Sequence, residues 1–326
     1  MKVFSWQKKT LFDDFEVYEL SCKNSGNPFG DISISVSPLG MNTCIVSIGG
    51  KNVIDIDMER LKKGANYGIP VLYPTPNRVT DGTIEFEGKK HSLIYNGRLI
   101  SSHGLARLVK FEITDISADE NCAKITGKMP FNKQMPWFEA FPFESDFYVA
   151  VTLYSDSFSI AYSVVNGGER LPFGFALHPF FYKIDGEHDT QIVINSTDLM
   201  HITEENIKLG QYYDFKNTEV DFTKPTSVAD VPSAVKGGTV HYNVKLPDTS
   251  EVIYKKSGFK IVLKATDDMD KLVTFFPAGF DYFCLENQTC SIDAINLEAR
   301  GIKAGMLVAQ PNQTLSGKVT FAVEKL

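Results

Sequence analysis

The fold class follows from two neighbouring stretches, Phe147-Tyr-Val-Ala-Val-Thr-Leu-Tyr154 and Phe158-Ser-Ile-Ala-Tyr-Ser-Val164. Both are rich in β-branched and aromatic residues, which pack well on the pleated surface of a half-buried sheet. The second also alternates polar and apolar residues, and this period of two sends successive side chains to opposite faces of a strand. We therefore expect each stretch to form a half-buried β-strand.

The same strand pattern recurs from one end of the sequence to the other. It appears near the start in Asp31-Ile-Ser-Ile-Ser-Val36 and near the end in Lys318-Val-Thr-Phe-Ala-Val323. Clusters of Gly, Pro, Asn and Asp, such as Asn24-Ser-Gly-Asn-Pro28, separate the strands as turns do. Residues 83–86 and 91–95, with a turn over 87–90 between them, are typical of a β-hairpin.

Helical signals are few. Short helices are possible over 57–65 and 227–235, and Pro232 limits the second. Because the strands do not alternate with long amphipathic helices, a parallel βαβ fold is disfavoured. The sequence predicts an all-β protein, a large antiparallel β-sandwich with few short helices. We expect a single domain over residues 1–326, since large all-β domains often exceed the usual domain length.

Composition and charge exclude several classes of partner. Hydrophobic residues make up 43% of the 326 residues, which is ordinary for a globular protein. The net charge is −7, so the chain has no electrostatic attraction to nucleic acid or to an anionic membrane. The first residues lack the continuous apolar segment of a signal peptide. We expect neither nucleic-acid nor membrane partners, and the oligomeric state stays open between monomer and homodimer.

Cysteine spacing and missing motifs restrict the chemistry further. The five cysteines include no CxxC pair, so a disulfide framework or a zinc site is disfavoured and free thiols in the cytoplasm are expected. The sequence has no GxGxxG after a strand, no phosphate-binding loop, no HExxH and no GxSxG. We therefore expect no cofactor and no bound metal.

His178 lies within the apolar run Leu171-Pro-Phe-Gly-Phe-Ala-Leu-His-Pro-Phe-Phe181. A polar ring in such surroundings must find a hydrogen-bond partner or bind something. Pro179 restricts His178 to an extended backbone. A satisfied core histidine is the general alternative, and the proline and the neighbouring aromatic residues favour a functional one.

Glu286 is equally unusual, because it ends the apolar segment Phe280-Asp-Tyr-Phe-Cys-Leu-Glu286. Acidic side chains are seldom buried without a partner. Burial would raise the pKa of this carboxyl toward the range of a general base. The alternative is a structural ion pair with Arg78 or Arg107, and the residues alone leave both interpretations open.

Two further segments offer polar side chains. In Tyr73-Pro-Thr-Pro-Asn-Arg-Val79 the prolines present Asn77 and Arg78, whose forked donors suit sugar hydroxyls or a carboxylate. His103 precedes Gly104, which lets backbone or ligand approach closely. A surface turn is the alternative for the first segment. Trp137 could stack on a sugar face or belong to the core.

Together these segments resemble the aldose 1-epimerase family, also called galactose mutarotases. The resemblance covers nearly the whole chain, and its order and spacing are more specific than any single motif. The matching segments are Pro76-Asn-Arg-Val79, His103-Gly104 with Arg107, Leu171-Pro-Phe-Gly-Phe with His178-Pro-Phe-Phe181, Leu285-Glu286 with Gln288, and Asp293-Ala-Ile-Asn296. The resemblance implies a large twisted antiparallel β-sandwich, the galactose mutarotase-like supersandwich.

The resemblance also implies a reaction, the interconversion of the α and β anomers of a free hexose. His178 is similar to the family's general acid and Glu286 to its general base. His103 resembles a histidine near the sugar ring oxygen, and Asn77 and Arg78 resemble a substrate-binding pair. We further expect Glu286 to raise the pKa of the His178 imidazole, which would widen a bell-shaped pH profile.

One departure and three alternatives remain. An Asp that binds sugar hydroxyls in many members has no counterpart here, and His241 or Asn243 falls near its expected place. The departure puts the preferred sugar in doubt. The alternatives are a hexose-6-phosphate 1-epimerase, a sugar-binding module without catalysis, and a glycosidase, for which a second carboxylate is missing.

Overall fold

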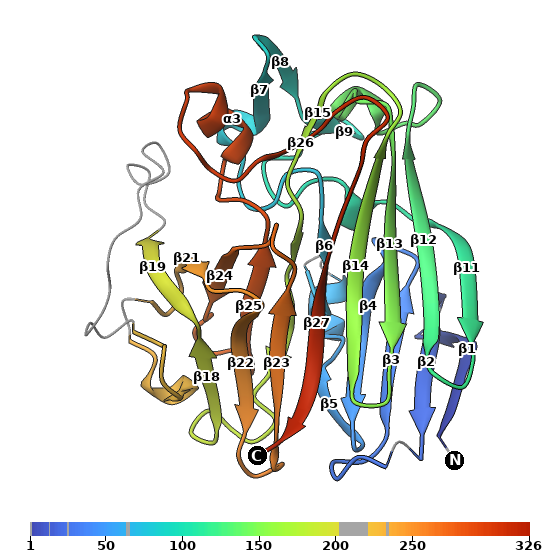
Figure 1. Ribbon diagram of the computed structural model, residues 1–326, viewed down its shortest axis with the longest axis vertical. Coiled ribbons are helices and arrows are strands. Elements are labelled where there is room, and N and C mark those ends of the chain that lie inside the picture. Colours follow the sequence, from blue (N-terminus) through green and yellow to red (C-terminus); the bar gives the residue numbers. More distant parts are fainter. Residues whose placement is uncertain (1, 13, 25, 63–65, 202–220, 233–234) are drawn as a thin grey trace.

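The computed structural model describes residues 2–12, 14–24, 26–62, 66–201, 221–232 and 235–326. Its largest unit, called the long sheet, spans the width of the molecule in Figure 1. Every pairing in it is antiparallel. In spatial order the long sheet contains β11 (Glu112–Ala118), β12 (Ala123–Phe131), β13 (Ser145–Leu153), β14 (Ser157–Asn166), β27 (Thr314–Lys325), β23 (Phe259–Ala265), β22 (Asp248–Tyr254), β18 (Thr190–Ile194) and β20 (Thr226–Ser227).

Two other sheets pack against the long sheet. The N-terminal sheet contains β1 (Val3–Leu11), β2 (Phe15–Lys23), β3 (Ile32–Ser37), β4 (Asn42–Ile48) and β5 (Lys51–Ile54). The β25 sheet contains β19 (Ser196–His201), β21 (Thr239–Val244), β24 (Lys271–Phe275), β25 (Tyr282–Gln288), β16 (Ala176–Leu177) and β6 (Val71–Leu72), with β17 (Phe180–Tyr182) also paired to β25. Figure 1 shows the blue strands of the N-terminal sheet behind the green strands β11–β14.

Side chains from both layers form one apolar core, as a sandwich requires. Val149 of β13 and Tyr162 of β14 stand opposite one another and are buried, as the alternation in the two quoted stretches predicts. On the other half, Phe181 of β17 contacts Phe321 of β27. The same cluster of buried residues extends from Leu20 to Val323. The predicted all-β antiparallel sandwich is confirmed; the single domain stays a prediction, which this shared core supports.

Short elements complete the described chain. The small sheets pair β7 (Thr83–Phe86) with β8 (Lys89–Ser92), β9 (Ile94–Tyr95) with β10 (Arg98–Leu99), and β15 (Leu171–Phe173) with β26 (Leu307–Ala309). The helices are α1 (Met58–Lys62) and α3 (Ala294–Ala299), and the 3-10 turns are η1 (Thr80–Gly82), η2 (Ala106–Leu108), η3 (Phe138–Ala140) and η4 (Val228–Asp230). The predicted hairpin forms with a tighter turn, at Glu87 and Gly88, both of which have positive φ.

The helix expectations are met unevenly. The first is realised as α1, although residues 63–65 of the expected range lie outside the described residues. The second reduces to the 3-10 turn η4, capped by Ser227 Oγ, which accepts from the Ala229 amide at 3.3 Å. Pro232 follows this turn and cannot continue an α-helix, and residues 233–234 lie outside the described part. The helix α3 was not predicted.

Candidate active site

The central strand of the site is β25, which is buried on both faces. Phe283 and Leu285 point into the sandwich core, and Asn287 on the same face donates from Nδ2 to Thr249 Oγ1 of β22 at 2.9 Å. Because side chains alternate along a strand, Cys284 and Glu286 point the other way. Only 2% of Glu286 is exposed, so this carboxyl lies in a nearly dry environment.

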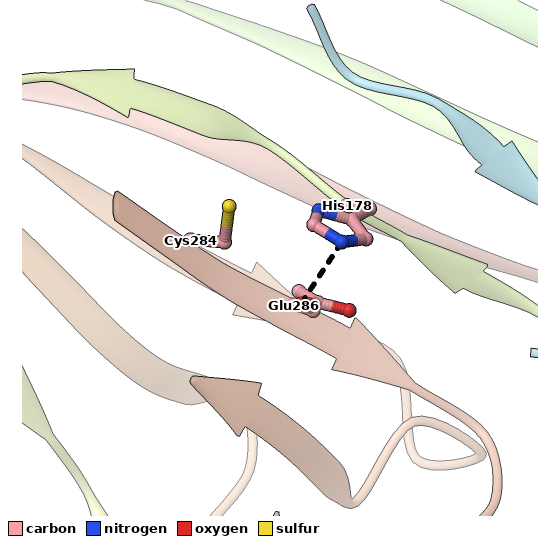
Figure 2. A group of neighbouring side chains, drawn as sticks. All are labelled: His178, Cys284 and Glu286. Atoms are coloured by element: carbon pink, nitrogen blue, oxygen red, sulfur yellow. Dashed lines mark ion pairs between the residues drawn. The ribbon is translucent and has the colours of Figure 1, made fainter. Parts of the chain in front are cut away.

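The register of the neighbouring strands brings His178 to Glu286. Ala176 of β16 stands opposite Gln288, and Phe180 of β17 stands opposite Cys284. The same register places His178, which lies between them, opposite Glu286. Its Nε2 atom is 3.3 Å from Glu286 Oε1, and Figure 2 shows the imidazole above the carboxylate. Pro179 has no N–H to donate, which explains why the ladder is interrupted at this point.

Two loops beside this pair carry the other predicted residues. The His103 amide donates to the Asn77 carbonyl at 2.7 Å, and both residues have positive φ. Gly104 is required here, because a Cβ at this position would lie 2.3 Å from the Tyr73 carbonyl oxygen. The His103 ring then packs edge-on against His178, with 5.4 Å between ring centroids.

A chain of amides holds the carboxylate in place. Asn77 Nδ2 donates to Gln288 Oε1 at 2.5 Å. Gln288 Nε2 in turn donates to Glu286 Oε2 at 3.3 Å. One carboxylate oxygen therefore faces Gln288 and the other faces His178, so Asn77 orients Glu286 through Gln288 as well as lining the site.

Burial decides the protonation of the pair. It raises the pKa of Glu286 well above the ordinary carboxyl range, opposed by the Gln288 hydrogen bond. Burial also lowers the pKa of His178 well below the ordinary imidazole range, and the nearby His103 adds to this. The expected rise of the His178 pKa is therefore wrong: its pKa is lowered, chiefly because burial removes the ring from water. Burial, with Arg107 and Arg78, lowers the pKa of His103 to about 4.

The pair opens onto a cleft of about 210 Å³. All of the predicted site residues, Asn77, Arg78, His103, His178 and Glu286, line it. Their roles stay predictions. The remaining lining residues are Arg60, Asn66, Phe180, Thr239, His241, Phe275 and Ile292.

The open alternatives can be compared with this geometry. Within the described residues, Glu286 contacts His178 and forms no ion pair with Arg78 or Arg107. Trp137 is not a cleft residue, since its Nε1 donates to the Pro130 carbonyl at 2.8 Å and its ring packs on the core. Trp137 is therefore structural.

Sequence reasoning missed several cleft residues. Arg60 comes from α1, and its guanidinium lies 4.8 Å from the centroid of the Phe180 ring, which also stacks on His178. Of the two residues named for the missing Asp, His241 lines the cleft and Asn243 does not. His241 stands opposite Val273, which stands opposite Glu286, so one row across β21, β24 and β25 carries both polar groups on the same face.

Several solved structures share the fold of this chain. A galactose mutarotase-like protein from Clostridium acetobutylicum matches with a TM-score of 0.79 and 17% identity over 99% of each chain. Galactose 1-epimerase from Lactobacillus acidophilus NCFM matches with a TM-score of 0.75 and 15% identity, over 100% of this chain and 99% of the other. The Slr1438 protein from Synechocystis sp. PCC 6803 matches with a TM-score of 0.72 and 22% identity, over 90% of this chain and 92% of the other.

The fold is thus that of the galactose mutarotase-like proteins. The sequence model of the aldose 1-epimerase family matches residues 52–322. The chain belongs to the aldose 1-epimerase family. Of the helices in the described residues, none has the length and apolar character needed to cross a bilayer.

Proposed function

We propose that this protein is a mutarotase, an aldose 1-epimerase that interconverts the α and β anomers of a free hexose. The observation that carries the proposal is the contact between His178 Nε2 and Glu286 Oε1, 3.3 Å long and at the wall of a sugar-sized cleft. An acid and a base in one enclosed pair suit a reaction that moves two protons and needs no cofactor.

The proton balance of the reaction fits a pair that holds one proton. Burial favours the form of the pair that carries this proton on Glu286. In the tautomer that carries it on His178, the Glu286 carboxylate takes the proton of the C1 hydroxyl while His178 gives its proton to the ring oxygen. The bond between C1 and the ring oxygen breaks, and C1 becomes an aldehyde carbon. After rotation about C1–C2, the two groups return the protons in reverse and the ring closes on the other face.

The remaining cleft residues would position the sugar. The guanidinium of Arg78 offers forked donors to hydroxyls, and His103 stands beside His178 where the ring oxygen must lie. His241 would contact hydroxyls further along the cleft as a neutral ring, since burial lowers its pKa to about 3. We further propose that the enzyme works in the cytoplasm, which its five free cysteines support.

Polarimetry tests the proposal directly. Freshly dissolved α-glucose and α-galactose should equilibrate faster with the protein than without it. Binding of either sugar without acceleration would favour the non-catalytic module instead. A glycosidase is disfavoured because, among the described residues that line the cleft, Glu286 alone has a carboxylate.

A second candidate substrate is a hexose 6-phosphate. Two guanidinium groups, those of Arg60 and Arg78, line the same cleft as Glu286. Arginine binds phosphate readily through its forked donors. Comparing the accelerations of α-glucose and α-glucose 6-phosphate at equal concentration decides between the two substrates.

A further inference from the structure

A thiol lies directly beside the acid–base pair and takes no part in the proposed reaction. Cys284 and Glu286 are two positions apart on β25, so their side chains share a face. His178 approaches that face from the segment between β16 and β17. One ligand atom from each of these residues lies within 4.8 Å of the other two, and Figure 2 shows the three side chains as neighbours.

These ligand types favour one class of cation. Imidazole nitrogen, thiolate sulfur and carboxylate oxygen are the usual ligands of Zn²⁺, at about 2.0–2.3 Å each. Tetrahedral bonds of that length put ligand atoms about 3.3–3.8 Å apart, so movements of about 1 Å would close the site. Mg²⁺ and Ca²⁺ prefer oxygen ligands alone and should be rejected.

The position of the cluster determines what a bound ion would do. His178 and Glu286 line the cleft, whereas Cys284 lies behind them against Phe180 and Tyr282. An ion held by all three would leave its fourth position open to the cleft. It would also occupy an imidazole nitrogen and a carboxylate oxygen that the reaction needs.

We propose that His178, Cys284 and Glu286 form an inhibitory binding site for a thiophilic divalent cation of the Zn²⁺ type. Its inhibitory part rests on the proposed epimerase function, whereas ion binding does not. His178 Nδ1 has no hydrogen-bond partner among the described residues, and zinc-ligating histidines are usually fixed by such a partner. The ion is therefore exchangeable and is removed by a chelator such as EDTA.

Cobalt provides a test that needs no activity. Co²⁺ added to the purified protein should produce a thiolate-to-cobalt charge-transfer absorption in wild type. The absorption should disappear in Cys284→Ala and persist in Cys290→Ala, which removes another buried thiol outside the cluster. Cys284→Ser is a second variant, and circular dichroism checks that each is folded. Absence of the absorption in wild type, or its persistence in folded Cys284→Ala, overturns the site.

Inhibition of mutarotation by Zn²⁺ provides a second test of the site. Zn²⁺ should slow the wild-type reaction, EDTA should restore it, and Mg²⁺ should have no effect. Cys284→Ala should keep its basal rate and require at least about tenfold more Zn²⁺ for the same inhibition. Equal sensitivity of Cys284→Ala and wild type overturns the inhibitory role. If no mutarotation is found at all, the proposed function fails and the cobalt measurement still decides whether the ion binds.

Discussion

The strands β13 and β25 bury their side chains in different ways. In β13 buried and half-buried residues alternate strictly, because one face packs on the core and the other meets solvent. In β25 every residue from Tyr282 to Gln288 is buried. The outward face of β25 is covered by α1 and by the loops that carry Asn77 and His103, and its polar groups are therefore desolvated.

This difference in burial distinguishes the strand of the proposed active site. Asp146, a carboxylate on the outer face of β13, is partly exposed and pairs with Lys128 at 2.8 Å. Such an exposed ion pair contributes little to the stability of the fold. The corresponding face of β25 places Glu286 against His178 with almost no solvent. The two strands thus use the same alternation, one to present a face to solvent and the other to enclose His178 and Glu286, the proposed acid and base.

The largest expected effect comes from removing the proposed base. Glu286→Gln should lower kcat by about two to four powers of ten, the range of general-base catalysis, and His178→Ala should lower it by a similar factor. Thermal unfolding of Glu286→Gln should occur at or above the wild-type temperature, because a buried ionisable group becomes a neutral amide. Asp146→Asn is the matched control and should leave kcat unchanged. Near-wild-type turnover of Glu286→Gln by polarimetry would exclude it as the base.

The pH profile sharpens the same assignment. kcat/KM should fall where the pair gains a second proton and where it loses its only one, giving a bell with macroscopic constants that belong to the pair. Because burial raises the pKa of Glu286, the pair should lose its only proton, and the basic limb should fall, above the ordinary carboxyl range. The residual activity of Glu286→Gln should lack this limb. An unchanged limb means that another group titrates.

Substitutions on the inner face of β25 should lower stability and leave kcat unchanged, the reverse of what is expected for Glu286→Gln. Leu285→Ala removes a side chain with 0% exposure and should lower the free energy of unfolding by about 2–5 kcal/mol. Val149→Ala in β13 should also destabilise, since both side chains belong to one core. Denaturant titration measures the loss, and kcat per folded molecule should stay near wild type. A large drop in kcat for Leu285→Ala would show that the two faces of β25 are coupled.

The burial of strand faces also explains which parts of the fold and of the candidate site could be predicted from the sequence. The alternation in 158–164 identifies β14 because one face of that strand meets solvent. Glu286 stands out for the converse reason, as an acid in an apolar segment. Arg60, Thr239 and Phe275 gave no signal, because each reaches the cleft from a separate segment and carries no motif. The six residues of α3 are too few for a helical period to be recognised.

Another effect concerns stability in acid. His241 is fully buried, and its pKa is lowered to about 3 by burial and by the charges of Lys271 and Arg78. The unfolded chain binds a proton below about 6.5, so stability from the neutral ring is present above that pH and is lost as the pH falls toward 3. Between pH 7 and 5 the loss should be about 2 kcal/mol. His241→Gln should lack this component of the loss in denaturant titrations at the two pH values. Parallel losses in both proteins would contradict the low pKa.

The smallest effect is expected at the rim of the cleft. Arg78 is exposed and would position hydroxyls without moving protons. Arg78→Ala should therefore raise KM by about tenfold, about 1.4 kcal/mol of binding, and leave kcat nearly unchanged. Initial rates over a range of sugar concentrations separate the two constants. A fall in kcat comparable with that of Glu286→Gln would place Arg78 in the chemical step.

The place of β27 in the long sheet has a consequence for synthesis. This strand pairs with β14 on one side and β23 on the other, so it alone joins the two halves of the long sheet within the described residues. While residues 314–325 are still inside the ribosome, β14 and β23 have no partner at those edges. A nascent chain therefore carries two open strand edges, which are prone to pairing with other chains. Folding of this protein should depend on chaperones most strongly in the interval just before β27 emerges.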